Sequence, residues 1–183
     1  AKVLDVACGI GLQGQVLRLM DFEGQIYGCD ISPGMIQRVW DRGCYDCAFI
    51  ADANGLLPAL SKAEGGGGLL PLFDVVICTG AMELLEDKQS VLAGIAKVTK
   101  PGGELWVSFQ HDTTRKLGQQ VSATEHQSVK GITQDAVVAL LSEAGFGQLL
   151  SMDVSPNAFY TPSPAQDGTL LPVPYLFLVA KKD

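Results

Sequence analysis

The chain has 183 residues, of which 47% are hydrophobic and 18% charged, and its formal net charge at pH 7 is −7. This length suits one compact domain with a sizeable core, so we expect a single domain over residues 1–183. No run of the sequence approaches the roughly 18 apolar residues of a membrane span, and no signal-peptide pattern is seen, so no membrane partner is expected. Because nucleic-acid binding depends on Lys and Arg, the negative charge argues against a nucleic-acid partner and favours a small or neutral ligand.

Short apolar runs alternate with amphipathic segments along the chain, a pattern typical of a parallel sheet wrapped by helices. The predicted strands, in chain order, are residues 2–7, 25–29, 47–51, 73–78, 104–109, 147–154 and 175–180. The predicted helices, with apolar residues at helical spacing or with capping residues at their ends, are 12–20, 33–42, 88–98 and 133–143. The last two strands are separated by a proline-rich segment, 156–174, and not by a helix. We therefore expect a terminal antiparallel hairpin on an otherwise parallel sheet of seven strands.

Two further segments are notable for their composition. Four glycines at 65–68 predict a flexible surface loop. Residues 119–130 are polar and match no helix or strand pattern. A ligand-cradling role is the alternative for the glycine loop.

The five cysteines are an odd set, Cys8, Cys29, Cys44, Cys47 and Cys78. Three of them lie in or beside apolar strand-like runs, where a free thiol behaves as a small hydrophobe. Free thiols indicate a reducing compartment, so we expect a cytoplasmic protein. The C-x-x-C pair has no second pair and no nearby His pair to complete four zinc ligands, so we expect no metal site.

Gly9, Gly11 and Gly14 spell G-x-G-x-x-G after the first strand, a pattern that serves NAD and S-adenosylmethionine (SAM) alike. Asp30, at the end of the second strand, suits the ribose diol of either cofactor, because one carboxylate can accept from both hydroxyls. Asp5 separates the two, since a carboxylate within an apolar strand needs a polar partner. It gains nothing beside a pyrophosphate, whereas the ammonium group of an amino-acid tail suits it. These residues favour SAM.

Five segments follow one another in order, with sequences VLDVACGIG (3–11), YGCDISPGM (27–35), ADA (51–53), FDVVICTGAME (73–83) and VTKPGGEL (98–105). They resemble the motifs of class I SAM-dependent methyltransferases, and the similarity covers nearly the whole chain. The run from Arg42 to Asp52 and the turn at 100–103 resemble most the small methyltransferase-like proteins of the Williams–Beuren region type. The resemblance implies an α/β, Rossmann-like fold with a seven-stranded, mostly parallel sheet, an antiparallel C-terminal strand and helices on both faces.

The resemblance also implies which residues hold the methionine tail of the cofactor. Ala7, Gly9 and Gly11 would form the wall around the tail, and Asp5 would fix its end through hydrogen bonds. Ala7 replaces the first glycine that is usual in the family, a change that its small size should allow. Gly14 is then predicted to be a helix-packing glycine.

For the nucleoside part, the resemblance implies that Asp30 holds the ribose hydroxyls and that Ile31 and Met35 pack on the adenine. A place in the core is the alternative for Ile31 and Met35, and a solvated strand end is the alternative for Asp30.

Asp52 and Ala53 would lie at the adenine edge, with the Asp52 carboxylate accepting from the exocyclic amine. Thr79 and Gly80 would border the cofactor where the methyl group leaves. The product would be S-adenosylhomocysteine (SAH).

Methyl transfer needs the acceptor held near the methyl group and no dedicated nucleophile. The segment 78–81 (CTGA) lacks the N/D-P-P-Y pattern of adenine and glutamine N-methyltransferases, so we expect a small-molecule acceptor. Glu83 and His111, which follow the fourth and fifth strands, are the candidates for a general base; solvated or substrate-contacting roles are the alternative. Leu84 stands where many small-molecule members carry a histidine. Tyr160 could shape the acceptor pocket.

The family normally has some tens of residues before the first strand, often with a helix over the cofactor, whereas this chain begins just before that strand. We expect either a truncated piece or an open cofactor site. Two other functions remain open: a non-catalytic relative that serves as a binding or scaffold protein, and an NAD-dependent oxidoreductase, which Asp5 and the later motifs disfavour. The sequence indicates neither the acceptor atom nor the oligomeric state.

Overall fold

The computed structural model describes residues 1–63, 72–111, 131–162 and 170–183. In these residues the strands are β1 (Lys2–Val6), β2 (Gln25–Asp30), β3 (Cys47–Ile50), β4 (Phe73–Cys78), β5 (Thr99–Gln110), β6 (Gln148–Pro162) and β7 (Leu170–Lys181). The α-helices are α1 (Leu12–Leu19), α2 (Pro33–Arg42), α3 (Leu56–Ala63), α4 (Lys88–Val98) and α5 (Gln134–Glu143). Two short 3₁₀ turns, η1 (Ala53–Gly55) and η2 (Met82–Leu84), follow β3 and β4.

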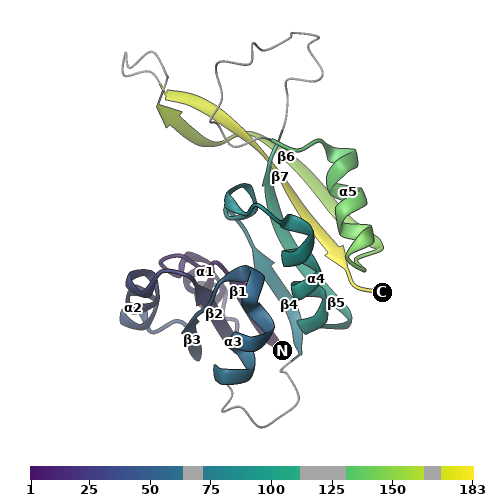
Figure 1. Cartoon of the computed structure of the whole chain (residues 1–183). Coiled ribbons are helices and arrows are strands. Elements are labelled where there is room, and N and C mark those ends of the chain that lie inside the picture. Colours follow the sequence, from purple (N-terminus) through teal and green to yellow (C-terminus); the bar gives the residue numbers. More distant parts are fainter. Residues whose placement is uncertain (64–71, 112–130, 163–169) are drawn as a thin grey trace.

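The strands form one sheet in the order β3-β2-β1-β4-β5-β7-β6. Strands β1 to β5 pair in parallel, and β7 pairs antiparallel with both β5 and β6 (Figure 1). The expected fold, seven strands with an antiparallel C-terminal strand, is therefore confirmed. The order reverses direction between β1 and β4, and in open α/β sheets ligands bind outside the carboxyl ends of the strands at such a point.

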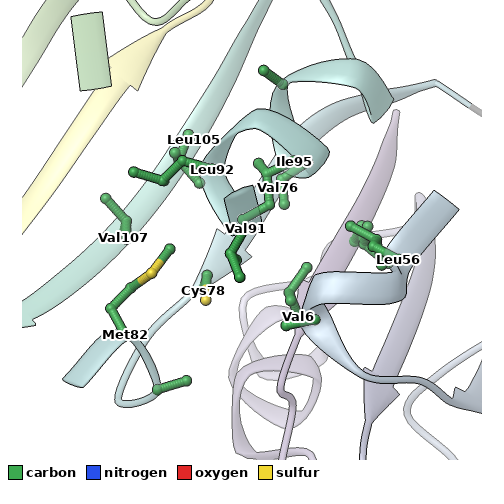
Figure 2. Packing of buried hydrophobic residues seen from close by; sticks show 14 of the residues in the cluster. Val6, Leu56, Val76, Cys78, Met82, Val91, Leu92, Ile95, Leu105 and Val107 are labelled. Atoms are coloured by element: carbon green, nitrogen blue, oxygen red, sulfur yellow. The ribbon is translucent and has the colours of Figure 1, made fainter. Parts of the chain in front are cut away.

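The larger core lies between one face of the sheet and helices α3, α4 and α5, which Figure 1 shows on the near side. Side chains of α4, namely Val91, Leu92 and Ile95, are fully buried among residues of β4 and β5 such as Val76 and Leu105 (Figure 2). Each such side chain contributes about 1.5–3 kcal/mol relative to an exposed position. This core holds β4 and β5 in place behind the carboxyl end of β1.

A smaller core lies on the other face, around Tyr45 in the connection between α2 and β3. A Cβ atom added at Gly14 would lie 2.2 Å from the Tyr45 ring, and one at Gly28 would lie 2.7 Å from it. A Cβ at Gly11 would approach the ring to 3.0 Å. The ring thus fills space that only glycines leave open, and the prediction that Gly14 is a packing glycine is confirmed.

The structure corrects the prediction for the proline-rich segment, 156–174. Strands β6 and β7 occupy most of it, because β6 runs to Pro162 and β7 starts at Leu170. Strand β5 ends at Gln110, opposite Tyr175, and residues 170–173 of β7 pair with β6. Proline, which cannot donate a backbone hydrogen bond, is tolerated in such edge positions.

Other element limits differ from the prediction in smaller ways. Helix α3 was not predicted. It contains Pro58, and proline is tolerated in the first turn of a helix. Strand β5 begins at Thr99 and includes the expected turn at 101–103, where its register with β4 shifts. The glycine run at 65–68 and residues 119–130 lie outside the described residues, as does the side chain of Tyr160.

The Tyr45 packing predicts opposite effects for two glycine-to-alanine changes in helices. We expect Gly14→Ala to lower the free energy of unfolding by about 1–3 kcal/mol, because the new methyl group overlaps the Tyr45 ring. The matched control is Gly94→Ala in α4, where no atom lies within 4 Å of the added Cβ in the described part of the chain. It should raise the free energy by about 0.5–1 kcal/mol. Urea unfolding measures both, and a change of the same sign in the two variants would contradict the packing.

Candidate active site

A cavity of about 630 Å³ opens at the carboxyl ends of β1 and β4, within the size range of small-molecule sites. Six of the predicted cofactor residues line it: Asp5, Ala7, Gly9, Met35, Thr79 and Gly80. The other lining residues are Cys8, Ile10, Leu12, Gln13, Ser108 and Phe177. The remaining five predicted residues, Gly11, Asp30, Ile31, Asp52 and Ala53, do not line this cavity.

The loop after β1 brings backbone to the edge of this cavity. Ala7 and Gly9 both adopt left-handed backbone angles, with φ of +56° and +54°. At Gly9 no atom of the described residues lies within 4 Å of an added Cβ, so the space beside its backbone is open. That opening fits a ligand that approaches the main chain closely.

Asp5 lies in β1, borders the cavity and is only 2% exposed. Its Oδ2 accepts a hydrogen bond of 2.6 Å from the Tyr45 hydroxyl, and this hydroxyl in turn accepts one of 3.0 Å from the Gly14 amide. Burial raises the pKa of Asp5 to about 7, although the Tyr45 hydrogen bond lowers it; the negative charge of Asp30 raises it further. The polar partner that the sequence required is therefore a tyrosine 40 residues away.

Asp30 is fixed at the end of β2 by two backbone amides. Its Oδ2 accepts from Gly9 at 2.9 Å, and its Oδ1 accepts from Ser32 at 2.9 Å. Each carboxylate oxygen has a second lone pair with which it can accept from a ligand hydroxyl. Ile31 and Met35 are 67% and 36% exposed, so the alternative that they belong to the core is wrong.

The predicted adenine-edge residues lie apart from the main cavity. Asp52 caps η1, because its Oδ1 accepts from the amide and the side chain of Asn54 at 2.9 and 3.0 Å. It lines a separate surface cavity with residues of β3 and α3. Ala53 is 8% exposed and packs in the core, so its backbone is the part left to contact a ligand.

Two side chains that the sequence analysis missed support the loop after β4. Gln13 donates from Nε2 to the Thr79 hydroxyl at 2.9 Å, and Ser108 accepts from the Gly80 amide at 2.8 Å. Ser108 is 1% exposed. A serine inside the apolar run of β5 was a detectable signal of the same kind as Asp5 in β1.

The two general-base candidates differ in their surroundings. Glu83, in η2, accepts from the Tyr175 hydroxyl on Oε1, while its buried Oε2 has no hydrogen-bond partner among the described residues. The Tyr175 ring lies 6.2 Å from that of Phe177, which lines the main cavity. His111 has a buried Nδ1, also without a hydrogen-bond partner in the described part of the chain. Neither Glu83 nor His111 lines the cavity.

The cysteines are free in the structure. Burial raises the thiol pKa of Cys8, Cys29 and Cys78 well above neutral, so these groups stay protonated and are poor nucleophiles. In the described ranges no three His, Cys, Asp or Glu side chains gather as metal ligands. No helix there is long and apolar enough to cross a membrane.

A second cavity, of about 530 Å³, lies between α1 and the sheet. Val16, Met20, Ile77 and Trp106 give it a mostly apolar wall. It lacks the Gly9 turn and the buried Asp5 carboxylate that border the first cavity. The cavity at the ends of β1 and β4 is therefore the candidate cofactor site.

Comparison with known proteins agrees with this fold and site. A family model described as a methyltransferase domain matches residues 1–145, so the chain belongs to that family of methyltransferase domains. The chain is 39% identical over 109 residues to methyltransferase-like protein 27 of Homo sapiens, covering 56% of this chain and 38% of that protein. It is 25% identical over 126 residues to a ubiquinone biosynthesis O-methyltransferase of Xanthomonas oryzae, covering 69% of this chain and 50% of that protein. The chain thus spans half or less of the length of these relatives.

Solved structures share the fold at low sequence identity. TehB from Haemophilus influenzae superposes with a TM-score of 0.70 at 14% identity, covering all of this chain and 57% of that one. Magnesium protoporphyrin IX methyltransferase from Synechocystis, solved with bound SAH, gives a TM-score of 0.67 at 17% identity and covers 99% of this chain and 74% of that one. The resemblance to class I SAM-dependent methyltransferases is therefore confirmed for family and fold.

The buried Asp5 carboxyl predicts a pH dependence of stability. Its pKa is raised from 3.8 in the unfolded chain to about 7 in the folded one, so its stabilising contribution is complete below pH 3.8. That contribution, up to about 4 kcal/mol, should disappear as pH rises to about 7 in the ligand-free protein. Urea unfolding between pH 5 and 8 measures it. In Asp5→Asn the free energy of unfolding should no longer carry this pH dependence. Parallel curves of unfolding free energy against pH for the variant and the unmodified protein would contradict the raised pKa of Asp5.

Proposed function

We propose that the chain is a SAM-dependent methyltransferase that acts on a small molecule and holds the cofactor in the cavity at the ends of β1 and β4. The observation that carries the proposal is Asp5, a nearly buried carboxylate that borders a cavity beside an open glycine turn. An uncompensated buried carboxylate is costly, and the ammonium group of a methionine tail would compensate it. A pyrophosphate at the same place would add repulsion.

The proposed contacts follow the geometry from the tail to the adenine. Asp5 in its ionised form pairs with the ammonium group, and the backbone at Ala7, Gly9 and Gly11 encloses the tail. Asp30, which two amides already orient, accepts from the ribose hydroxyls. Met35, exposed at the cavity edge, covers the adenine together with Ile31.

At the far side of the adenine, Asp52 accepts from the exocyclic amine and Ala53 contributes its backbone. Thr79 and Gly80 border the place where the methyl group leaves, and Gln13 and Ser108 hold them there. When bound, SAM supplies a methyl group activated by a positively charged sulfur. The residues around it contribute by orientation and by exclusion of water.

For the methyl acceptor we propose a small molecule that loses a proton to Glu83 as it is methylated. Glu83 is supported by its buried Oε2, which has no partner among the described residues, and by the Tyr175 hydroxyl that orients the carboxylate. The net charge of −7 and the names of relatives from ubiquinone biosynthesis support a small acceptor. Free cysteines support a cytoplasmic location, and one sheet through all the described strands supports a single domain.

Calorimetric titration with SAH tests the cofactor assignment without knowledge of the acceptor. We expect SAH to bind with one site per chain and NADH to show no binding. Tight NADH binding without SAH binding would refute the proposal in favour of an oxidoreductase. Binding of neither would favour a non-catalytic relative.

Asp30 gives a specific prediction for this titration. Asp30→Ala should weaken SAH binding at least tenfold, about 1.4 kcal/mol, because it removes the acceptor for the ribose and the anchor of the Gly9 amide. Asp41→Ala is the matched control, since Asp41 is an exposed residue of α2 that accepts a hydrogen bond from Gln37, a neighbour on the same helix. The Asp41→Ala variant should bind SAH with the same affinity as the unmodified protein. Unchanged affinity in Asp30→Ala would refute the ribose contact.

A further inference from the structure

We propose that Tyr45 is a positioning residue of the cofactor site, whose hydroxyl holds the Asp5 carboxylate in the orientation that receives the ammonium group of the methionine tail. The inference rests on the proposed function and adds to it a residue that does not itself line the cavity.

The Tyr45 hydroxyl joins two elements of the site. It donates to Asp5 Oδ2 at 2.6 Å, and it accepts from the Gly14 amide in α1 at 3.0 Å. Both hydrogen bonds are buried. Because a tyrosine hydroxyl has a single proton, its donor is committed to Asp5 while the helix amide fixes its oxygen. The carboxylate in β1 is thereby tied to the first turn of α1.

The Tyr45 ring is held so that the hydroxyl cannot turn away. It lies against the backbone of Gly14 and Gly28, at distances that a Cβ at either position would not allow. The next residue, Asp46, accepts from the Ile26 amide at 2.7 Å and from Arg18 at 2.8 Å. Two neighbouring residues of the α2–β3 connection are therefore fixed to β2 and α1, which makes this connection a rigid support for the carboxylate.

The charges around Asp5 make the Tyr45 hydrogen bond important. Among the described residues, the titratable groups that interact electrostatically with Asp5 are Tyr45, Asp30 and the thiols of Cys8, Cys29 and Cys78. None of these groups is a cation. The Tyr45 hydroxyl is the influence that lowers the Asp5 pKa against burial and Asp30. Without it, the carboxyl would need a higher pH to ionise and would lose its fixed orientation.

Tyr45→Phe removes the hydroxyl and keeps the ring. The test measures calorimetric affinities of the full chain for SAH and for 5′-methylthioadenosine, which has the same nucleoside but no amino-acid tail, between pH 6 and 9. We expect Tyr45→Phe to weaken SAH binding about tenfold at pH 7.5 and to move the pH at which SAH affinity rises to a higher value. Affinity for 5′-methylthioadenosine should stay within twofold.

Tyr27→Phe is the matched control, because Tyr27 is a buried tyrosine of β2 that packs in the core on the opposite face of the sheet. Its variant should keep the affinities for both ligands. A second measurement combines Tyr45→Phe with Asp5→Asn, which removes the buried acid and so the need for the hydroxyl. In that background Tyr45→Phe should cause no further loss of SAH affinity relative to 5′-methylthioadenosine.

The possible outcomes distinguish a failure of the Tyr45 inference from a failure of the proposed function. Equal losses for the two ligands in Tyr45→Phe, or an unchanged pH profile, would overturn the role of Tyr45 while SAH binding by the unmodified chain upholds the proposed function. The same further loss in the Asp5→Asn background would also overturn it. If the unmodified chain binds neither ligand, the proposed function is wrong and the inference is wrong with it.

Discussion

The buried carboxylate of Asp5 is the constraint on which the rest of the site depends. Removing a carboxylate from water costs several kcal/mol unless hydrogen bonds or charges compensate it. In this chain the compensation comes from the Tyr45 hydroxyl, and the ring that carries it needs space beside α1 and β2. Glycines at 11, 14 and 28 leave that space. One polar group in β1 thus accounts for a tyrosine and three glycines elsewhere.

The sheet order explains why these residues meet at one edge. Because β1 and β4 are parallel neighbours at the point where the order reverses, their carboxyl ends open side by side. Asp5 and Gly9 come from the first of these strands and the loop after it, and Thr79 and Gly80 come from the loop after the second. The large core behind β4 and β5 is apolar and rigid, so the polar groups at the edge keep their positions.

Much of the fold was predictable because its signals are local. Apolar runs predicted all seven strands, and the absence of a helix between the last two strands indicated the hairpin. The proline-rich segment was misassigned because proline forbids a strand only where its missing amide is needed, and that depends on where β5 ends. The partners of Asp5, Thr79 and Gly80 were missed because they lie 28 to 66 residues away in sequence. Only the packed structure brings such pairs together.

The most direct test of the cofactor site is a crystal structure of the chain with SAH. The account predicts the amino-acid tail in the cavity beside Gly9, with its ammonium group within hydrogen-bond distance of Asp5 and the ribose hydroxyls on Asp30. A nucleoside bound instead between α1 and Trp106, or a tail that points away from Asp5, would contradict it.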